Sequence, residues 1–453
     1  MLSSKHPDES PRGFWYGLIN FEHRLPTPDD FKLDRMRKVL DLLGNPEKKL
    51  KFVHVAGSKG KGSTSAMLAA ILSQQGLRTG LYTSPHLVHV EERLSIDGQN
   101  ISASALDLIL ANIKMVIGFP ECEPLGFVPT FFEVATVVAF LHFLENKVDV
   151  AILEVGLGGR LDSTNVCNPL LSIITSISMD HEKQLGPTLV HIAKEKAGII
   201  KSGVPVVSGV CNSGPRQVIE DVASKMGAKL VQAKVDFTWD YNPGIFKDSL
   251  IVEPSVQIKT QKKQWPSMEM VLLGEHQAAN AALVVSAVEE LRLLGIGISD
   301  EAVRWGLGNT RWPARMQVLC HSPWVVIDCA HNGASAGALV RTLRESFPEV
   351  PRVLLFGASS DKDISGMFKE FSGIFTKVIF AQSINSPRAS KPSELSEIWA
   401  QNCTGEAFLS GTLEEAARKA FLVTPKPGIL CITGSVFLAG EISPILSKLI
   451  SVK

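Results

Sequence analysis

The chain has 453 residues, which exceeds the size at which a single hydrophobic core stops growing, so we expect two or three domains. Its 46 lysines and arginines balance 46 aspartates and glutamates. This balance excludes a global electrostatic attraction to nucleic acid or to an anionic membrane. The seven cysteines are scattered and contain no CxxC pair, so neither a disulfide framework nor a zinc site is indicated and a reducing compartment fits best.

Two segments bear on export and on membranes. Residues 1–12 carry charged side chains and two prolines in place of the apolar core of a secretory signal, so export through the usual signal is not expected. The apolar run 134–144 contains His142 and is well short of the roughly 20 residues that span a bilayer, so we interpret it as a buried helix. We predict a cytoplasmic protein without a membrane partner.

The first half of the chain alternates apolar, strand-like runs with longer helix-like segments, up to about residue 209. The runs lie at 52–56, 79–83, 148–153, 171–175 and 204–207. Continuous apolar runs of this length are typical of parallel strands that are buried on both faces. The pattern predicts a doubly wound α/β domain.

A different pattern follows, in which short β-prone pieces alternate with polar residues. These pieces lie at 237–241, 250–254, 256–259 and 269–273, and they predict a small antiparallel excursion. A helix is then predicted over 275–294.

The segment 309–315 reads Asn-Thr-Arg-Trp-Pro-Ala-Arg and breaks the helical pattern at its proline. We therefore place a domain boundary between residues 311 and 312. Beyond it, each of four apolar runs precedes a helix-like segment; the runs lie at 325–328, 352–356, 377–381 and 429–433. This predicts a second, smaller Rossmann-like α/β domain over 312–453.

A glycine-rich loop joins the first strand-like run to a helix-like run, and it consists of Gly57, Ser58, Lys59, Gly60, Lys61, Gly62, Ser63 and Thr64. Closely spaced glycines let backbone N–H groups converge on an anion, and the N-terminus of the following helix favours negative charge. Lys61 is placed to reach the outer phosphates of a nucleotide. The spacing departs from GxxxxGK[ST], since Gly62 separates Lys61 from Ser63, and a simple glycine turn is the alternative for the loop alone.

Polar side chains follow three further strand-like runs, namely Ser84, Glu154 and His181. The carboxyl ends of parallel strands meet at one rim of a sheet, where open α/β folds bind ligands. Hard oxygen donors beside phosphate suit Mg²⁺. Each residue also has an ordinary explanation: a Ser-Pro turn, a structural salt bridge and a structural histidine. Together with Lys61 at the same rim, they favour a site for a nucleotide and a metal ion.

A series of peptides extends this interpretation over nearly the whole chain. In order, they are HVAGSKGKGST, LYTSPHL, LEVGLGGRLDSTN, MDHEKQLGPT, IAKEKAGIIK, GEHQAANAA, RWPARM, DCAHN and ITGSVFLAGEI. The series resembles the folylpolyglutamate synthase and dihydrofolate synthase family, whose members are ATP-dependent enzymes of the Mur ligase superfamily. The resemblance implies that L-glutamate is joined to a pteroate or folate carboxylate through an acyl phosphate, with ATP and Mg²⁺ and with closure between domains.

The resemblance also implies roles for individual residues. The loop from Gly57 to Thr64 would bind the nucleotide, with Lys61 as a catalytic contact to the outer phosphates, and Ser84, Glu154 and His181 would hold Mg²⁺. Lys196 matches a lysine that is carbamylated in the family, which would turn a cation into a carboxylate-like ligand. Asn280 resembles the adenine-contacting asparagine. Arg315, Asp328 and His331 resemble groups that close over the nucleotide and the incoming glutamate, and Asp328 or His331 would assist loss of the amine proton.

Two departures from the family pattern bear on this site. The family usually reads GTNGKGS, whereas Ser58 and Lys59 stand here, so an additional positive charge lies beside the phosphates. Ala314 replaces a glycine in a WPGR-like linker, which puts details of closure in question rather than the reaction.

The acceptor is left open by the sequence: dihydropteroate, reduced folates, or both. We favour a bifunctional, monomeric enzyme over a monofunctional dihydrofolate synthase or folylpolyglutamate synthase. A Mur-type cell-wall ligase is disfavoured because only 56 residues precede Gly57. A non-catalytic nucleotide-binding protein is disfavoured because Lys61, Glu154, His181 and Lys196 are all present.

Overall fold

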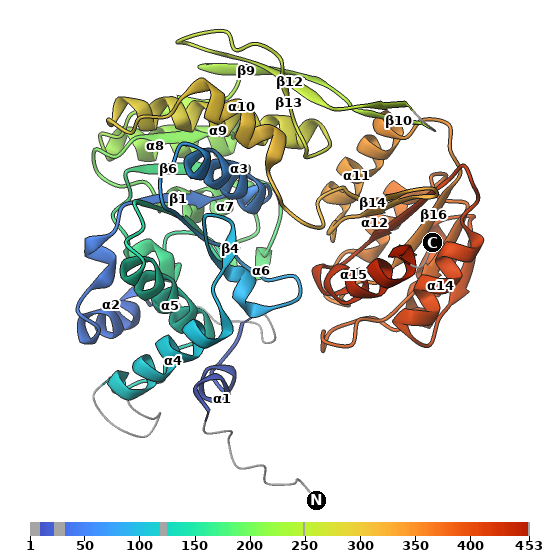
Figure 1. Cartoon of the computed structure of the whole chain (residues 1–453), viewed down its shortest axis with the longest axis horizontal. Helices are drawn as coiled ribbons and strands as arrows, with labels where there is room; N and C mark the ends of the chain where they lie inside the picture. Colours follow the sequence, from blue (N-terminus) through green and yellow to red (C-terminus); the bar gives the residue numbers. More distant parts are fainter. Residues whose placement is uncertain (1–9, 22–31, 118–124, 248–249, 452–453) are drawn as a thin grey trace, which may run out of the picture. The chain divides into compact units, whose positions relative to one another are not determined.

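The structure is a computed structural model that describes residues 10–21, 32–117, 125–247 and 250–451 (Figure 1). Residues 1–9, which form most of the segment analysed for an export signal, lie outside these ranges. The chain divides into two compact units. The first contains Met1–Trp239, Ile258–Pro266 and Ala279–Thr310, and the second contains Asp240–Gln257, Ser267–Ala278 and Arg311–Lys453. Within the described ranges, no helix combines the length and the apolar character needed to cross a membrane.

The first unit is built on an eight-stranded sheet, counted within the described ranges, in the order β4-β3-β2-β5-β1-β6-β7-β8. The strands are β1 (Phe52–Ala56), β2 (Thr79–Tyr82), β3 (Leu94–Ile96), β4 (Gln99–Asn100), β5 (Val150–Glu154), β6 (Leu171–Ile174), β7 (Val206–Ser208) and β8 (Leu230–Gln232). The six strands β2, β5, β1, β6, β7 and β8, in this spatial order, pair parallel to one another. Strand β3 pairs antiparallel with β2 and with β4. The predicted doubly wound α/β fold is confirmed, and the continuous apolar runs are its buried central strands.

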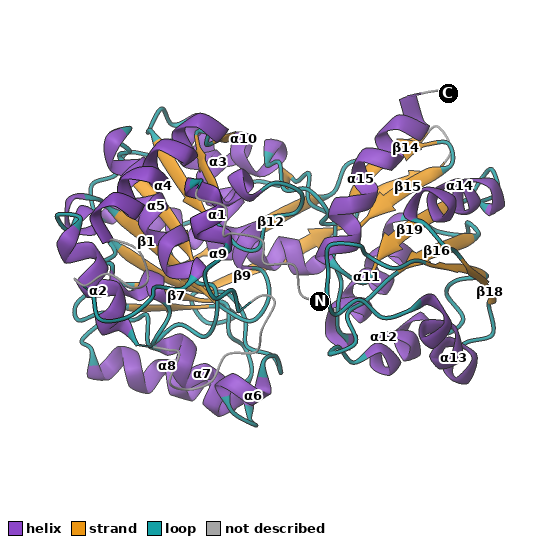
Figure 2. Cartoon of the chain, turned by 90° about the horizontal axis from the view of Figure 1, so that it is seen from below, coloured by secondary structure: helices purple, strands orange, loops and turns teal. Residues whose placement is uncertain are grey.

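Helices cover this sheet, namely α1 (Pro11–Tyr16), α2 (Leu33–Leu42), α3 (Lys61–Gln74), α4 (Ala103–Ile117), α5 (Phe131–Glu145), α6 (Glu182–Leu185), α7 (Leu189–Ala197), α8 (Ser213–Lys225), α9 (Glu275–Leu293) and α10 (Asp300–Asn309). Helix α3 contacts β1, β2 and β5 and packs along α10. Helices α2, α4 and α5 form one apolar core with β1, β2 and β5, and α7 and α8 form another with β6 and β7. Figure 2 shows α7 and α8 together along one side of the sheet. The predicted buried helix at 134–144 is α5.

The predicted antiparallel excursion is present as two small sheets. One has the order β13-β12-β9 and the other pairs β10 with β11; the strands are β9 (Phe237–Asn242), β10 (Ile245–Lys247), β11 (Leu250–Val252), β12 (Ser255–Thr260) and β13 (Met268–Glu269). The boundary between the two units falls within β9 and within β12. Strand β13 is shorter than the predicted run 269–273 because the chain turns toward Gly274, whose φ is 108°.

The second unit has a six-stranded sheet in its described part, in the order β14-β15-β19-β16-β17-β18, with β14 antiparallel to β15 and the others parallel. Its strands are β14 (Gln317–His321), β15 (Trp324–Ile327), β16 (Arg352–Phe356), β17 (Lys377–Phe380), β18 (Glu406–Leu409) and β19 (Ile429–Thr433). Its helices are α11 (Gly333–Ser346), α12 (Ile364–Phe371), α13 (Pro392–Asn402), α14 (Leu413–Val423) and α15 (Val436–Ser451). An aromatic-rich core joins the sheet to α11, α12 and α13.

Candidate functional site

The glycine loop connects β1 to α3 in a conformation that only glycines tolerate at two positions. Gly57 has φ 151° and Gly60 has φ 87°. A Cβ atom on Gly57 would lie 1.8 Å from Thr175 Oγ1, and one on Gly60 would lie 2.5 Å from Asn280 Oδ1. Both the backbone angles and the close neighbours therefore exclude larger residues.

The turn after β6 holds the backbone of this loop in place. Ser58 N donates to Ser176 O at 2.7 Å, and Thr175 Oγ1 donates to Lys59 O at 2.6 Å. Lys59 N in turn donates to Ser176 Oγ at 3.1 Å. Residues 175 and 176 thus fix the backbone of the loop. Gly60, the N-cap of α3, offers no side chain to the first N–H groups of that helix. Uncapped N–H groups at a helix N-terminus form a ready site for an anion.

Two lysines donate to a single backbone oxygen in the loop. Lys61 Nζ lies 3.1 Å from Gly57 O, and Lys196 Nζ, from the last turn of α7, lies 3.0 Å from the same atom. Lys196 is only 4% exposed. Burial, and then the nearby Lys61 ammonium, lower the pKa of Lys196 to about 7. A large share of Lys196 is therefore neutral at physiological pH, which makes its amine a nucleophile.

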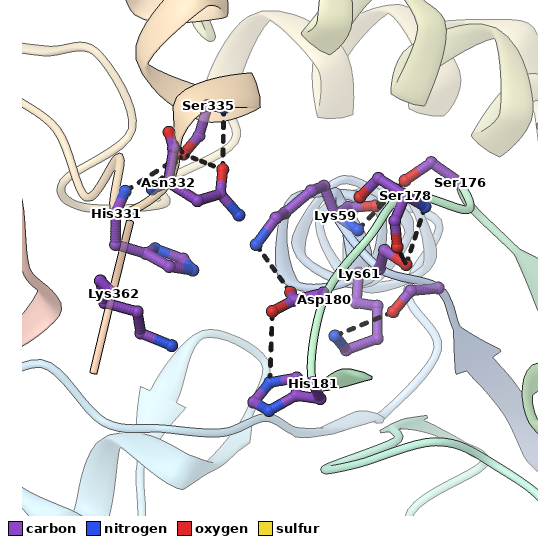
Figure 3. A network of polar contacts seen from close by, with 12 residues as sticks. Lys59, Lys61, Ser176, Ser178, Asp180, His181, His331, Asn332, Ser335 and Lys362 are labelled. Carbon is purple, nitrogen blue, oxygen red and sulfur yellow. Dashed lines mark hydrogen bonds and ion pairs between the residues drawn. The ribbon is translucent and has the colours of Figure 1, made fainter. Parts of the chain in front are cut away.

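The other lysine of the loop, Lys59, is held by an ion pair. Lys59 Nζ lies 2.8 Å from Asp180 Oδ2, and the other Asp180 oxygen lies 3.7 Å from His181 Nε2 (Figure 3). His181 has φ 52°, a left-handed conformation at the start of α6, and its side chain is half exposed. Asp180 is therefore the direct partner of the loop.

Ser84 and Glu154 come together at the ends of the neighbouring strands β2 and β5. Ser84 N donates to Glu154 Oε2 at 3.3 Å, and Glu154 is 4% exposed. No group of three or more His, Cys, Asp or Glu side chains with metal-binding proximity occurs in the part of the chain that the structure describes. The hydroxyl and carboxylate of this pair nevertheless fit Mg²⁺, which binds through one or two carboxylates together with substrate phosphates. His181 follows β6, which β1 separates from β5, and it offers nitrogen rather than oxygen.

A buried polar network of Asp162, Thr164 and His54 holds the loop after Glu154 in place. Asp162 accepts hydrogen bonds from Leu157 N at 2.9 Å and Thr164 N at 3.0 Å. Thr164 Oγ1 also lies 2.8 Å from Nε2 of His54, which is fully buried in β1. Burial lowers the pKa of His54 to about 3, so this histidine is neutral at physiological pH.

The same loop packs tightly against the end of α7. Arg160 N donates to Glu195 O at 2.8 Å, and the Arg160 guanidinium pairs with the Glu195 carboxylate at 2.9 Å. A Cβ atom on Gly159 would lie 2.8 Å from Glu195 O and 3.1 Å from Lys196 Cα. The segment that follows Glu154 is thereby fixed to the helix that carries Lys196.

Asn280, from α9, lies against Gly60 at the start of α3. Within the first unit, the structure therefore gathers most of the sequence-predicted residues around one loop. Residues 57–64 form the loop, and Asn280 and Lys196 contact it. Lys59 links the loop to the Asp180–His181 turn, and Ser84 meets Glu154 at two neighbouring strand ends.

The second unit holds the remaining predicted residues: Asp328 and His331 follow β15, and Arg315 lies in the linker before β14. Asp328 accepts hydrogen bonds from Met316 N at 2.9 Å and from Ala330 N at 2.7 Å. His331 Nδ1 lies 2.8 Å from Cys329 O, which orients its ring. Burial raises the pKa of the Cys329 thiol to about 11, so this thiol stays protonated.

The linker before β14 also has an unusual backbone. Ala314 and Met316 both have positive φ, 55° and 47°, and they flank Arg315. The alanine that replaces a glycine therefore occupies a left-handed position, the conformation that glycine adopts without strain.

Several residues of the site were not predicted from the sequence. They are Thr175 and Ser176, which clamp the loop, Asp180, which holds Lys59, and the His54–Thr164–Asp162 network. The only local signal for Asp180 is its position beside His181 after a buried strand. Thr175, Ser176 and the His54–Thr164 pair are revealed by contacts between residues that lie more than 100 positions apart; His54 and Thr164, for example, are separated by 110.

Comparison with known proteins agrees with this architecture. The Mur ligase middle domain matches residues 55–288, and the Mur ligase glutamate ligase domain matches residues 314–436. The dihydrofolate synthase/folylpolyglutamate synthase of Bacillus subtilis is 37% identical over 415 residues, which cover 90% of this chain and 94% of the relative.

Two solved structures extend the similarity to three dimensions. Mycobacterium tuberculosis folylpolyglutamate synthase, complexed with ADP and AMPPCP, superposes with a TM-score of 0.83 at 30% identity and covers 93% of this chain and 95% of that one. Escherichia coli FolC, in complex with DHPP and ADP, superposes with a TM-score of 0.83 at 28% identity and covers 98% and 100%. The chain therefore belongs to the folylpolyglutamate synthase and dihydrofolate synthase family, the ATP-dependent amide-forming ligases of the Mur ligase superfamily.

Proposed function

We propose that this ligase joins L-glutamate to the carboxylate of both dihydropteroate and reduced folates, acting as dihydrofolate synthase and folylpolyglutamate synthase in one chain. Relatives that carry both names, including that of Bacillus subtilis, support the bifunctional assignment. We further propose that residues 1–311 bind ATP and the pteroate or folate, that residues 312–453 bind glutamate, and that the protein works as a cytoplasmic monomer.

The observation that carries the proposal is the convergence of donors at the start of α3. The uncapped N–H groups of the helix and the Lys61 ammonium, which donates to Gly57 O, gather at the loop. This arrangement suits the negative charge of a nucleotide polyphosphate. In this proposal Lys61 holds the outer phosphates and neutralises the charge that develops on them during phosphoryl transfer.

Magnesium is the cofactor that the family implies, and in this proposal Ser84 and Glu154 hold it, with His181 as the third predicted contact. When bound, it neutralises phosphate charge and aligns the phosphoryl group with its acceptor. Glu154 is suited to this role because its carboxylate is buried at a strand end, where few water molecules compete for it.

Lys196 is proposed to carry a carbamate. A neutral lysine amine adds to CO₂ and loses a proton, which leaves a negatively charged carbamate on Nζ. The lowered pKa of Lys196, about 7, supports this step because it supplies the neutral amine at physiological pH. The carbamate would place an anion beside Gly57 O, and a carboxylate-like group is the kind of ligand that a metal ion takes.

The reaction then proceeds in two transfers. An oxygen of the substrate carboxylate attacks the γ-phosphorus, ADP leaves, and an acyl phosphate remains. The glutamate amine, after losing its proton, attacks the acyl carbon, so that an amide forms and inorganic phosphate leaves. Arg315, Asp328 and His331 are proposed to act on the nucleotide and on glutamate, with Asp328 or His331 receiving the amine proton.

The test is release of phosphate that depends on ATP, Mg²⁺ and L-glutamate, with 7,8-dihydropteroate and, separately, tetrahydrofolate as acceptors. The products are identified by mass spectrometry, and the Lys61→Met variant is the inactive control. Turnover of both acceptors supports the bifunctional proposal. Turnover of one acceptor alone would show that the enzyme is monofunctional. If the protein binds ATP but turns over neither acceptor, the proposed substrates are refuted.

A further inference from the structure

The backbone of Lys59 is fixed by hydrogen bonds, whereas its side-chain ammonium group can change position. Its N–H and C=O are bound by Ser176 and Thr175, so the Cα position is set by the turn after β6. Its four-carbon side chain ends in a compact ammonium group that can change partners by rotation. Lys59 and Asp180 are 29% and 15% exposed, so water reaches the pair and rearrangement does not require unfolding.

More lysines than carboxylates surround the Lys59–Asp180 pair. Lys61 and Lys196 share Gly57 O nearby. Burial and the Lys61 charge lower the pKa of Lys196, while Asp180 raises it and Lys59 lowers it to a smaller extent, so both members of the pair act on the same loop. His181 Nε2 also lies 3.7 Å from Asp180. Asp180 is thus a carboxylate held within a cluster of lysines where a polyphosphate is expected to bind.

We propose that Asp180 is an internal competitor of the nucleotide: it holds the Lys59 ammonium in the free protein, and the polyphosphate displaces it, so that the Lys59–Asp180 pair sets the affinity for ATP and ADP. This inference rests on the proposed nucleotide site and adds a residue that limits binding. A polyphosphate carries several negative charges against one on Asp180, so it attracts Lys59 more strongly at equal distance. Asp180 then keeps His181 as its neighbour.

A purely structural ion pair leads to different expectations. Ion pairs that water reaches contribute little to stability. Removal of either partner would then lower stability slightly and would affect nucleotide binding in the same direction for both variants. A competitor predicts opposite directions for the two partners.

The experiment measures equilibrium binding of ADP, of AMPPCP and of adenosine by calorimetry, using the full chain without folate or glutamate. The variants are Lys59→Asn, Asp180→Asn, the double variant, and Lys225→Asn, which removes an exposed lysine at the end of α8 as a charge-matched control. Lys59→Asn should weaken ADP and AMPPCP binding by about tenfold, because one charge-assisted contact is lost. Asp180→Asn should tighten both by about threefold to tenfold. Adenosine, which lacks phosphate, and the Lys225→Asn protein should show no change.

In the double variant, the gain from Asp180→Asn should be smaller than in the presence of Lys59. Asp180→Asn protein that binds nucleotide more weakly than wild type, or with the same affinity, overturns the proposal, as does unchanged binding by Lys59→Asn protein. These measurements need no acceptor substrate. A protein that binds nucleotide but fails to ligate glutamate would therefore refute the proposed function and still test this inference.

Discussion

Replacement of Lys196 by methionine is expected to stabilise the free protein, and more so at neutral than at alkaline pH. In the folded protein burial and the Lys61 charge lower the pKa of Lys196 to about 7, against 10.5 for an ordinary lysine. Between these two values the unfolded chain binds more protons than the folded chain, so wild-type stability rises with pH. Methionine has a similar shape and does not titrate.

The size of the effect follows from the same pKa. At 1.36 kcal/mol per pKa unit, proton release from Lys196 opposes folding by about 4 kcal/mol at pH 7 and by about 2 kcal/mol at pH 9. The variant loses the hydrogen bond to Gly57 O, worth about 1 kcal/mol at either pH. We therefore expect Lys196→Met to be more stable by about 3 kcal/mol at pH 7, an advantage that shrinks by about 2 kcal/mol at pH 9.

The assay is urea unfolding followed by tryptophan fluorescence at pH 7 and pH 9, in buffers freed of bicarbonate so that Lys196 stays unmodified. Lys194→Met, which replaces an exposed lysine of the same helix, is the control and should show no such pH dependence. Packing effects do not change with pH. An equal free-energy difference at both pH values would therefore refute the argument from the Lys196 pKa, whatever its sign.

Three further substitutions test other parts of the first unit. Glu154→Gln should abolish ligation. It should also remove the gain in AMPPCP affinity that Mg²⁺ provides, which calorimetry with and without the metal measures. An undiminished gain in affinity would exclude Glu154 as a metal ligand. Gly159→Ala should destabilise the protein by about 2 kcal/mol or more, because the added Cβ would lie 2.8 Å from Glu195 O, and an unchanged urea midpoint would contradict this close packing. Lys147→Gly should stabilise it by about 0.5–1 kcal/mol, because the exposed Lys147 has φ 52°, and a lower melting temperature would count against that strain.

The central part of the fold could be predicted from the sequence because its signal is local. Strands β16 and β19 coincide with the predicted runs 352–356 and 429–433, since a strand buried on both faces must be apolar throughout. Strands β4, β14 and β18 were not predicted. They lie at sheet edges, and their residues are largely half-buried or exposed, so they show no continuous apolar run.

The candidate site divides in the same way. The glycine loop and its lysine are contiguous, so the spacing of Gly57, Gly60 and Lys61 indicates a candidate phosphate-binding turn, with a simple glycine turn as the alternative for the loop alone. The contact between Lys196 and Gly57 O joins residues 139 positions apart, and that between Lys59 and Asp180 joins residues 121 apart. No local pattern encodes such pairs, because they depend on the order in which parallel strands are placed in the sheet.

The uncapped start of α3 has a practical consequence for work with this protein. Its free N–H groups and the Lys61 ammonium form an anion site that does not distinguish a nucleotide from a simple buffer salt at high concentration. Sulfate, phosphate or citrate in a purification buffer should therefore raise the melting temperature and weaken apparent nucleotide affinity by competition, in proportion to their occupancy. Binding constants for this protein are best measured in monovalent, weakly coordinating buffers.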